Sequence, residues 1–307
     1  MLPRSTFRRA PPVSPAPPVL TAGEVWMREQ LTHLRVARFT PASIASFLRA
    51  SQRRARETRQ ARPDLARRAR RWTALGGVAC VGFAASRPAG RRKHLTRGLL
   101  WWAAVAVMLD WHLGMFETDD GRPRNLGPAD ALTLFRAWLV PVIADTLQPA
   151  VVLLAATTDV LDGVAARATA PTRAGRDLEG LVDGLLFGAA MLGARRRDEL
   201  PRGAVALEAT RLASSGAYTA LVYFRRAEAP NPAITRAARV TTPLRTGALL
   251  AAGQGHRRTA SALLATGSLL SLAALRAHRR SSRRAARHRP WGRAHPPQRS
   301  GRRTPST

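Results

Sequence analysis

The sequence is short of cysteine, of acidic residues and of aromatic residues. It has one cysteine, Cys80, in 307 residues. A lone cysteine forms no intrachain disulfide and supplies no zinc motif built on cysteine pairs, so disulfide scaffolds and zinc fingers are excluded. The first 24 residues carry arginines and a proline cluster without a following apolar stretch. This pattern predicts no cleavable signal peptide.

Acidic residues are scarce. The 19 Asp and Glu stand against 50 Lys and Arg, so the formal net charge is +31. A chain with this charge is expected to meet an anionic partner, either a lipid surface or a nucleic acid. Aromatic residues make up 6% of the chain, yet hydrophobic residues make up 45%. That apolar content excludes a disordered polycation.

The positive charge lies mostly at the two ends of the chain. Residues 1–71 hold sixteen arginines and four acids, and residues 278–307 hold ten arginines and no acid. The ends therefore carry +22 of the +31, which leaves +9 for the middle. We divide the chain into a basic, partly disordered cytoplasmic head (1–71), extra apolar helices and a loop (72–129), a main membrane domain (130–277) and an arginine-rich disordered cytoplasmic tail (278–307).

Eight apolar segments run through the middle of the chain, and several approach the length that a membrane-spanning helix needs. With short basic connectors between them, they predict an all-α polytopic membrane helical bundle, with a soluble all-α bundle as the alternative. The segments are Trp72–Ser86, Gly98–Phe116, Leu132–Thr146, Pro149–Ala165, Leu178–Ala194, Gly203–Phe224, Thr242–Gly253 and Thr259–Ala277.

The distribution of Lys and Arg predicts a multi-pass protein of the cell membrane with both termini in the cytoplasm, which requires an even number of crossings. The basic loop from Arg87 to Arg97 conflicts with this topology, because an even count places it outside. Either Trp72–Ser86 does not cross the membrane, or the arginines of this loop reflect the arginine-rich composition of the whole chain and not its topology.

The head contains one predicted amphipathic helix. Thr40 and Pro41 form a typical helix start, and Ile44, Phe47 and Leu48 then fall on one face, followed by arginines. Such a helix lies on anionic headgroups, binds RNA or is simply solvated. RNA is the weaker of these because no aromatic residues alternate with the arginines to stack on bases.

Four acids lie within or at the ends of apolar segments, where an unpaired charge is costly. They are Asp159, Asp162, Glu179 and Asp183. Spacings of three and four place each pair on one helix face, and a turn between the helices brings the four carboxylates together. Hard divalent cations such as Mg²⁺ prefer such oxygen ligands. The alternative is structural pairing with arginines such as Arg136, Arg167 and Arg211.

Small residues lie beside these acids. Gly163 is four residues after Asp159, and Gly175 is four residues before Glu179, so both place bare backbone on the acidic face. We expect this to leave room for a ligand. Ala166 keeps the same face small, and Arg167 is placed to bind a phosphate group.

The string D-V-L-D-G-V-A-A-R from Asp159 to Arg167, followed after seven residues by G-R-D-L-E-G-L-V-D from Gly175 to Asp183, closely resembles a family signature. The signature of the CDP-alcohol phosphatidyltransferases reads D-x-x-D-G-x-x-A-R, a gap, then G-x-x-x-D-x-x-x-D. Leu132-Thr133 with Arg136 and Pro141 is similar to the family's first-helix pattern, and the segment from Thr242 to Thr246 is similar to a weaker downstream region. The resemblance covers about Asp130–Ala277.

The resemblance implies a six-helix membrane core, here with one or two extra N-terminal apolar helices, and an active site open to the cytoplasm. It also implies a homodimer and two divalent ions, Mg²⁺ or Mn²⁺. In the implied reaction, an acceptor alcohol attacks the lipid-linked phosphate of a CDP-alcohol such as CDP-diacylglycerol, and CMP leaves. By position in the signature, the metal ligands are Asp159, Asp162, Glu179 and Asp183, the general base is Asp183, and the nucleotide pocket is lined by Gly163, Ala166, Arg167 and Gly175.

Two positions depart from the pattern. Glu179 stands where the family has Asp, which moves the carboxylate by one methylene, and Asp130 stands where Asn is usual, where it caps a helix or alters a nucleotide contact. A catalytically degenerate membrane scaffold or anionic-lipid-binding protein of the same fold is therefore the alternative. A nucleic-acid binder rests on the net charge alone, and we expect no nucleic-acid partner.

The acceptor alcohol is not readable from the sequence. Arg136, Arg211 and Arg245 are the candidates for holding an acceptor phosphate. Each of them is equally able to extend toward lipid headgroups.

Overall fold

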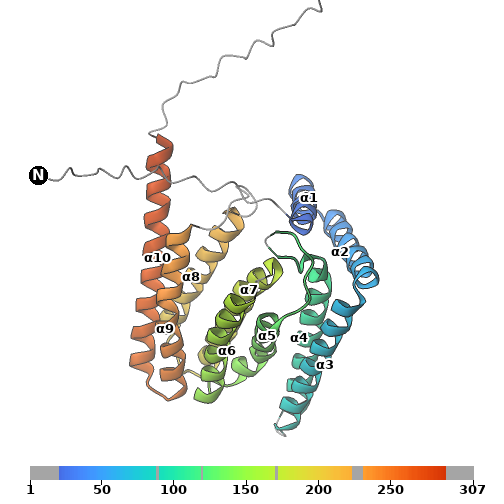
Figure 1. The fold of residues 1–307 in the computed structure, drawn as a ribbon. Coiled ribbons are helices and arrows are strands. Elements are labelled where there is room, and N and C mark those ends of the chain that lie inside the picture. Colours follow the sequence, from blue (N-terminus) through green and yellow to red (C-terminus); the bar gives the residue numbers. More distant parts are fainter. Residues whose placement is uncertain (1–20, 88–89, 119, 170–171, 223–230, 288–307) are drawn as a thin grey trace, which may run out of the picture.

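The computed structural model describes residues 21–87, 90–118, 120–169, 172–222 and 231–287 (Figure 1). Within these residues the chain forms helices and no strand beyond one isolated bridge between Glu117 and Pro123. The elements are α1 (Ala22–Val36), α2 (Pro41–Ala61), α3 (Pro63–Ala85), α4 (Arg91–His112), the short 3-10 helix η1 (Leu113–Met115), α5 (Pro128–Asp145), α6 (Pro149–Ala168), α7 (Arg173–Arg196), α8 (Arg202–Leu221), α9 (Pro232–Gly253) and α10 (Arg257–Arg287).

Proline and threonine set many of the helix starts. Proline is the first residue of five helices, where its fixed φ suits the helix and its missing N–H costs nothing. Before α2, the Thr40 hydroxyl accepts a hydrogen bond from the Ser43 N–H at 3.4 Å. The predicted helix start at Thr40 and Pro41 is confirmed.

Helices α5 to α10 form a six-helix bundle, and α5 lies on the side of it that faces α3 and α4 (Figure 1). One end of α5 packs through Ile143 and Leu139 into a core shared with α6, α7, α9 and α10. Its other end packs through Leu134 and Trp138 into a second core that includes residues of α3 and α4. The extra N-terminal helices therefore extend the same core that holds α5.

Two predicted boundaries differ in the structure. Helix α3 starts at Pro63, nine residues before the predicted apolar segment at Trp72, because the arginines of its first turns lie on the exposed face while Leu65, Ala66 and Ala69 are buried. Helix α10 continues to Arg287, so the predicted disordered tail is helical at its start. The rest of that tail, and residues 1–20 of the head, lie outside the described residues.

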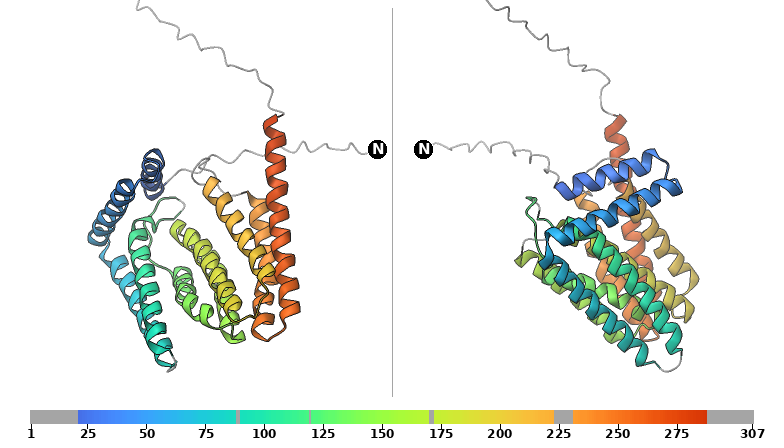
Figure 2. Two further views of the ribbon diagram at one scale, coloured as in Figure 1. Left: turned by 180° about the vertical axis from the view of Figure 1, so that it is seen from behind. Right: turned by 90° about the vertical axis from the view of Figure 1, so that its right-hand side faces the viewer.

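Both ends of the described chain lie at one end of the bundle. Helix α1 and the C-terminal end of α10 are both at the top in Figure 1. The two views in Figure 2 agree with this placement. This placement requires the chain to run along the bundle an even number of times between α1 and the end of α10.

Three helices are long and apolar enough to cross a membrane by length and composition: Arg91–Met115, Pro149–Ala168 and Arg257–Ser281. On the second of these, Val160 and Leu153 are 64% and 52% exposed. Apolar side chains on an outer helix surface are typical of a face toward lipid. The fold is an all-α membrane helical bundle.

Close helix packing depends on glycine at the end of the bundle away from both chain ends. A Cβ atom added at Gly193 of α7 would overlap the Ala144 carbonyl oxygen at the end of α5. Because that neighbour is backbone, relief requires the helices to move apart. Small residues at helix interfaces allow this approach in membrane bundles.

We expect Gly193→Ala to destabilise the bundle by about 1–3 kcal/mol, because it overpacks a backbone contact. The matched control is Gly216→Ala in α8, where nothing lies within 4 Å of an added Cβ. The control should raise stability by up to about 1 kcal/mol through helix propensity. Thermal unfolding of both variants in detergent measures the difference, and equal effects would contradict the packing argument.

Candidate active site

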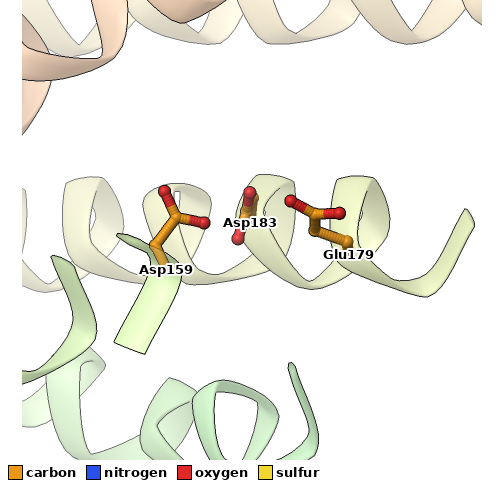
Figure 3. A group of neighbouring side chains, drawn as sticks. All are labelled: Asp159, Glu179 and Asp183. Carbon is orange, nitrogen blue, oxygen red and sulfur yellow. The ribbon is translucent and has the colours of Figure 1, made fainter. Parts of the chain in front are cut away.

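Carboxylates from two neighbouring helices converge. Helix α6 supplies Asp159, and α7 supplies Glu179 and Asp183, with ligand atoms of the three all within 4.8 Å of one another. Figure 3 shows Asp183 between the other two. The predicted juxtaposition of acids from these two helices is therefore found, and Glu179 reaches the cluster despite its longer side chain.

Arg136 of α5 lies at the base of this cluster and is fully buried. Its Nη1 donates a hydrogen bond to Asp159, its Nη2 donates to Asp162 at 2.8 Å, and its Nε lies 3.5 Å from Asp183 Oδ1. A planar guanidinium offers donors in several directions, which suits carboxylates that arrive from different helices. Arg136 therefore joins α5, α6 and α7 through charge.

Asp162 lies apart from the group of three. It is 3% exposed, and its Oδ2 accepts hydrogen bonds from Thr133 at 2.6 Å and from Arg136 at 2.8 Å. Both bonds fall on one oxygen, and no hydrogen bond from a described residue reaches Oδ1. Thr133 and Arg136 thus orient Asp162 and leave its second oxygen for another ligand.

Asp130 ties the starts of α5 and α7 together. Its Oδ2 accepts a hydrogen bond from the Gly127 N–H at 2.7 Å, and its Oδ1 accepts one from the Thr172 hydroxyl at 3.1 Å. The same Thr172 oxygen accepts from the Gly175 N–H at 3.0 Å, which caps α7. The departure from the family pattern at Asp130 therefore serves as a helix cap, one of its two predicted roles.

A pocket, here called the Asp130 pocket, extends from Asp130 toward Glu179. Its lining is Arg124, Gly127, Ala129, Asp130, Thr133, Asp162, Ala166, Thr169, Thr172, Gly175 and Glu179. It brings together two of the four predicted nucleotide-pocket residues, Ala166 and Gly175, with three acids. The motif residues thus line a concave surface that continues into the carboxylate cluster.

The predicted nucleotide-pocket residues differ in how much room they leave. At Gly175 a Cβ would lie 2.7 Å from both Asp130 Oδ1 and Thr172 Oγ1, so this glycine permits a tight contact instead of the open space that we predicted. At Gly163 a Cβ would meet only the end of the Arg167 side chain, at 3.3 Å. Arg167 itself is exposed, and its side chain makes no ion pair with a described residue.

The other two arginines predicted for the acceptor lie in a second polar cluster, between α8, α9 and α10. Arg211 forms an ion pair with the fully buried Glu208 at 2.6 Å, and Glu208 also accepts a hydrogen bond from Ser268 at 2.6 Å. Arg245 bonds to Thr242 at 3.2 Å and to Ser271 at 3.4 Å, and its buried Nε has no hydrogen-bond partner among the described residues.

Three residues of the site were not predicted. Thr133 and Thr172 orient Asp162 and Asp130, and Arg124 lines the Asp130 pocket. Thr172 could be found from sequence as a threonine three residues before Gly175 at a helix start. Arg124 has no such signal, because it reaches the pocket through the course of a loop.

Comparison with known proteins finds a match in the region of the chain that holds the carboxylate cluster. Residues 127–273 match the family model described as CDP-alcohol phosphatidyltransferase. These residues form a CDP-alcohol phosphatidyltransferase domain. No curated protein and no solved structure matches the chain. A domain of this family supports transfer of a phospho-alcohol group from a CDP-alcohol, and the family is generally dependent on divalent metal ions.

The residues present fit a hard divalent cation. The cluster offers only carboxylate oxygens, the donor type that Mg²⁺ and Mn²⁺ prefer, and the three side chains are partly open to solvent. The site residues of this domain also carry more negative charge than Arg136 balances. Additional positive charge at this point would stabilise the arrangement.

We expect Arg136→Gln to lower the free energy of unfolding by about 2–4 kcal/mol, because it leaves carboxylates near one another without their buried counter-charge. Addition of Mn²⁺ should recover more stability in this variant than in the parent. Arg195→Gln, which breaks an exposed pair between α7 and Asp198 just after it, is the control and should change little. Thermal unfolding with and without Mn²⁺ tests this, and identical metal effects in parent and variant would contradict it.

Proposed function

We propose that this protein transfers a phosphatidyl group from CDP-diacylglycerol, or a related CDP-alcohol, to a small polar acceptor alcohol in phospholipid biosynthesis. The observation that carries the proposal is the convergence of Asp159, Glu179 and Asp183 within the matched domain. The apolar outer surface of α6, which bears Asp159, suits a substrate that arrives from the lipid phase.

In the proposed reaction the acceptor hydroxyl oxygen bonds to the phosphorus that carries the lipid, and the bond from that phosphorus to the CMP oxygen breaks. Asp183 takes the proton from the hydroxyl. It is placed for this because its side chain is 38% exposed, while the buried Arg136 lies close to its Oδ1 atom only. The step is a transferase reaction of substituted phosphate groups, with CMP as the leaving group.

Metal ions complete the site in this proposal. Asp159, Asp162, Glu179 and Asp183 would hold two ions, Mg²⁺ or Mn²⁺, which supply charge neutralisation of the diphosphate and stabilise CMP as it leaves. The second oxygen of Asp162 faces no donor among the described residues, which supports a ligand role.

The nucleotide half is proposed to bind along Gly163, Ala166, Arg167 and Gly175. Ala166 and Gly175 line the Asp130 pocket, and Arg167 lies on the same helix with a guanidinium that no described acid neutralises. A guanidinium of this kind binds phosphate oxygens well.

Among the three arginines considered for the acceptor, the surroundings favour Arg245. Arg136 is bonded to the carboxylates of the site, and Arg211 is neutralised by Glu208. Arg245 lies over the ring of Phe187, 5.7 Å from its centre, and Phe187 follows Asp183 by one helical turn. Its unpartnered Nε supports a role in binding an anionic group of the acceptor.

The proposal places the protein in the cell membrane as a multi-pass protein with both termini in the cytoplasm. The arrangement of α1 and the end of α10 at one end of the bundle supports an even number of passes (Figure 1). The family resemblance adds a homodimer, which cross-linking in native membranes would measure.

The second candidate is a catalytically degenerate scaffold or anionic-lipid binder of the same fold, which the Glu179 substitution favours. A scaffold needs no divalent ion at the carboxylate cluster. Titration of the purified protein with Mn²⁺ distinguishes the two, because only the enzyme requires binding that Asp159→Asn and Asp183→Asn abolish.

The purified protein should release CMP from CDP-diacylglycerol when given Mg²⁺ or Mn²⁺ and the correct member of a panel of acceptor alcohols. Asp183→Asn should lower the rate at least about a hundredfold, because it removes the proposed base. Asp145→Asn, at the other end of α5, is the control for loss of a carboxylate. Turnover that persists in Asp183→Asn would exclude Asp183 as the base.

The Glu179→Asp variant should keep or raise the activity, because it restores the residue of the family pattern with the same charge. CMP release and Mn²⁺ affinity are measured side by side in the variant and the parent. An inactive variant beside an active parent would mean that the site is built around the longer side chain.

A further inference from the structure

The helices before the matched domain bind the loop that leads into α5. Arginines of α2 and α3, together with Arg62 between them, donate hydrogen bonds to backbone carbonyl groups of η1 and of this loop. Arg54 donates to Gly114 at 3.4 Å, Arg62 donates to Phe116 at 3.3 Å and to Arg124, and Arg68 donates to Leu126 at 2.7 Å. These arginines therefore hold this part of the chain through its backbone carbonyl groups.

The loop is also held by its own turn and by α1. The Thr118 N–H donates to the Arg122 carbonyl at 2.9 Å, and the Arg124 N–H donates to the Phe116 carbonyl at 2.8 Å. The Gly23 N–H of α1 donates to Glu117 Oε2 at 3.3 Å. The backbone of Arg124 is thus fixed on both sides, with its N–H bonded to Phe116 and its carbonyl bonded to Arg62.

This backbone places the Arg124 side chain on the wall of the Asp130 pocket, beside Asp130 and Gly127. Arg124 is half-buried, and its guanidinium makes no hydrogen bond or ion pair with a described residue, although it attracts the Asp130 carboxylate at longer range. Among the residues that line the pocket it is the one with a positive charge. A positioned guanidinium with free donors suits a ligand that brings acceptors.

The position of Arg124 along the pocket indicates which part of a ligand it meets. Asp130 precedes Arg136 by six residues on α5, so Asp130 lies about 9 Å along the helix from Arg136 at the base of the carboxylate cluster. Arg124 lies beside Asp130 and Gly127, at this distant end of the pocket. The diphosphate of a CDP-alcohol belongs at the carboxylates, where metal ions would lie. The nucleoside then extends toward Asp130 and Arg124.

We propose that Arg124 donates hydrogen bonds to the nucleoside end of the CDP-alcohol and that Arg62 is a positioning residue for it. The cytosine ring offers a carbonyl oxygen and an unprotonated ring nitrogen side by side, which matches the paired donors of a guanidinium. The inference rests on the proposed function. It adds a substrate-binding residue from outside residues 127–273, so the N-terminal helices become part of the active site.

The test compares steady-state kinetics of Arg124→Gln with the parent. The KM for the CDP-alcohol should rise about tenfold, the expected loss of a hydrogen bond from a charged donor, while the KM for the acceptor stays the same. Arg122→Gln, on the same turn but exposed and paired with Asp120, is the matched control and should match the parent. An unchanged KM for the CDP-alcohol, or a change confined to the acceptor, would overturn the proposal.

Two further variants separate binding from folding. Arg124→Lys keeps the charge and the aliphatic stem but loses the paired donors. Its KM for the CDP-alcohol should therefore lie between those of the parent and of Arg124→Gln. Arg62→Gln should raise the same KM by a smaller factor, with kcat and the acceptor KM unchanged. A fall in kcat at constant KM in Arg62→Gln would mean that Arg62 has a general structural role only, and would overturn its assignment.

Inhibition by CMP and by cytidine locates the contact on the ligand. Arg124→Gln should weaken both inhibitors by the same factor, whereas weakening of CMP alone would place Arg124 at the phosphate and overturn the nucleoside assignment.

Failure of the proposed function gives a different result, because the parent would then release no CMP from any CDP-alcohol. Calorimetric titration of the parent and Arg124→Gln with CMP tests the contact in that case as well, and equal affinities would overturn it.

Discussion

The structure depends on one buried guanidinium. Arg136 is surrounded by carboxylates of α6 and α7, and without it those helices would bring like charges together in an apolar bundle. One positive charge does not balance four acids, so the cluster keeps a net negative charge that favours cations at its open side. The same contact thus serves packing and chemistry, since the residue that joins three helices also leaves the carboxylate oxygens aimed at a common point.

The large positive charge of the chain has more than one role. In the head, Arg54, Arg62 and Arg68 bind carbonyl groups of the loop before α5, and Arg54 also lies over the ring of Trp26. These arginines act inside the protein and are not free to bind lipid with all their donors. The predicted amphipathic helix exists as α2, and Ile44 and Leu48 of its predicted apolar face are exposed, whereas the buried residues of α2 are Ser51 and Ala55. The arginines available to bind an anionic lipid surface are therefore the remaining exposed ones.

The sequence predicts the site well where the chemistry follows helical periodicity. Asp159, Glu179 and Asp183 were found because spacings of three and four on a helix fix which side chains share a face. From the sequence, Arg136 was either a structural partner of the acids or a candidate for holding an acceptor phosphate. Only the packing of α5 against α6 and α7 shows that it bonds to the acids. Gly175 was expected to give open space, but Asp130 and Thr172, distant in sequence, fill it. Arg124 was missed because a loop has no periodicity, and the course of η1 and of this loop depends on hydrogen bonds to residues of α1, α2 and α3 that are distant in the sequence.

The uneven apolar character of the helices has a consequence for how the chain enters a bilayer. Only α4 with η1, α6 and α10 are apolar enough to partition into lipid unaided, among the described helices. Helix α5 carries the buried Arg136, whose ion-pair partners lie on α6 and α7, whereas the buried Arg211 of α8 pairs with Glu208 of the same helix. A charged side chain in a lone helix opposes insertion by a few kcal/mol. Arg136 therefore gains its counter-charges where α6 and α7 lie beside α5, so α5 depends on these neighbours to enter a bilayer, whereas the ion pair of α8 is already complete within one helix.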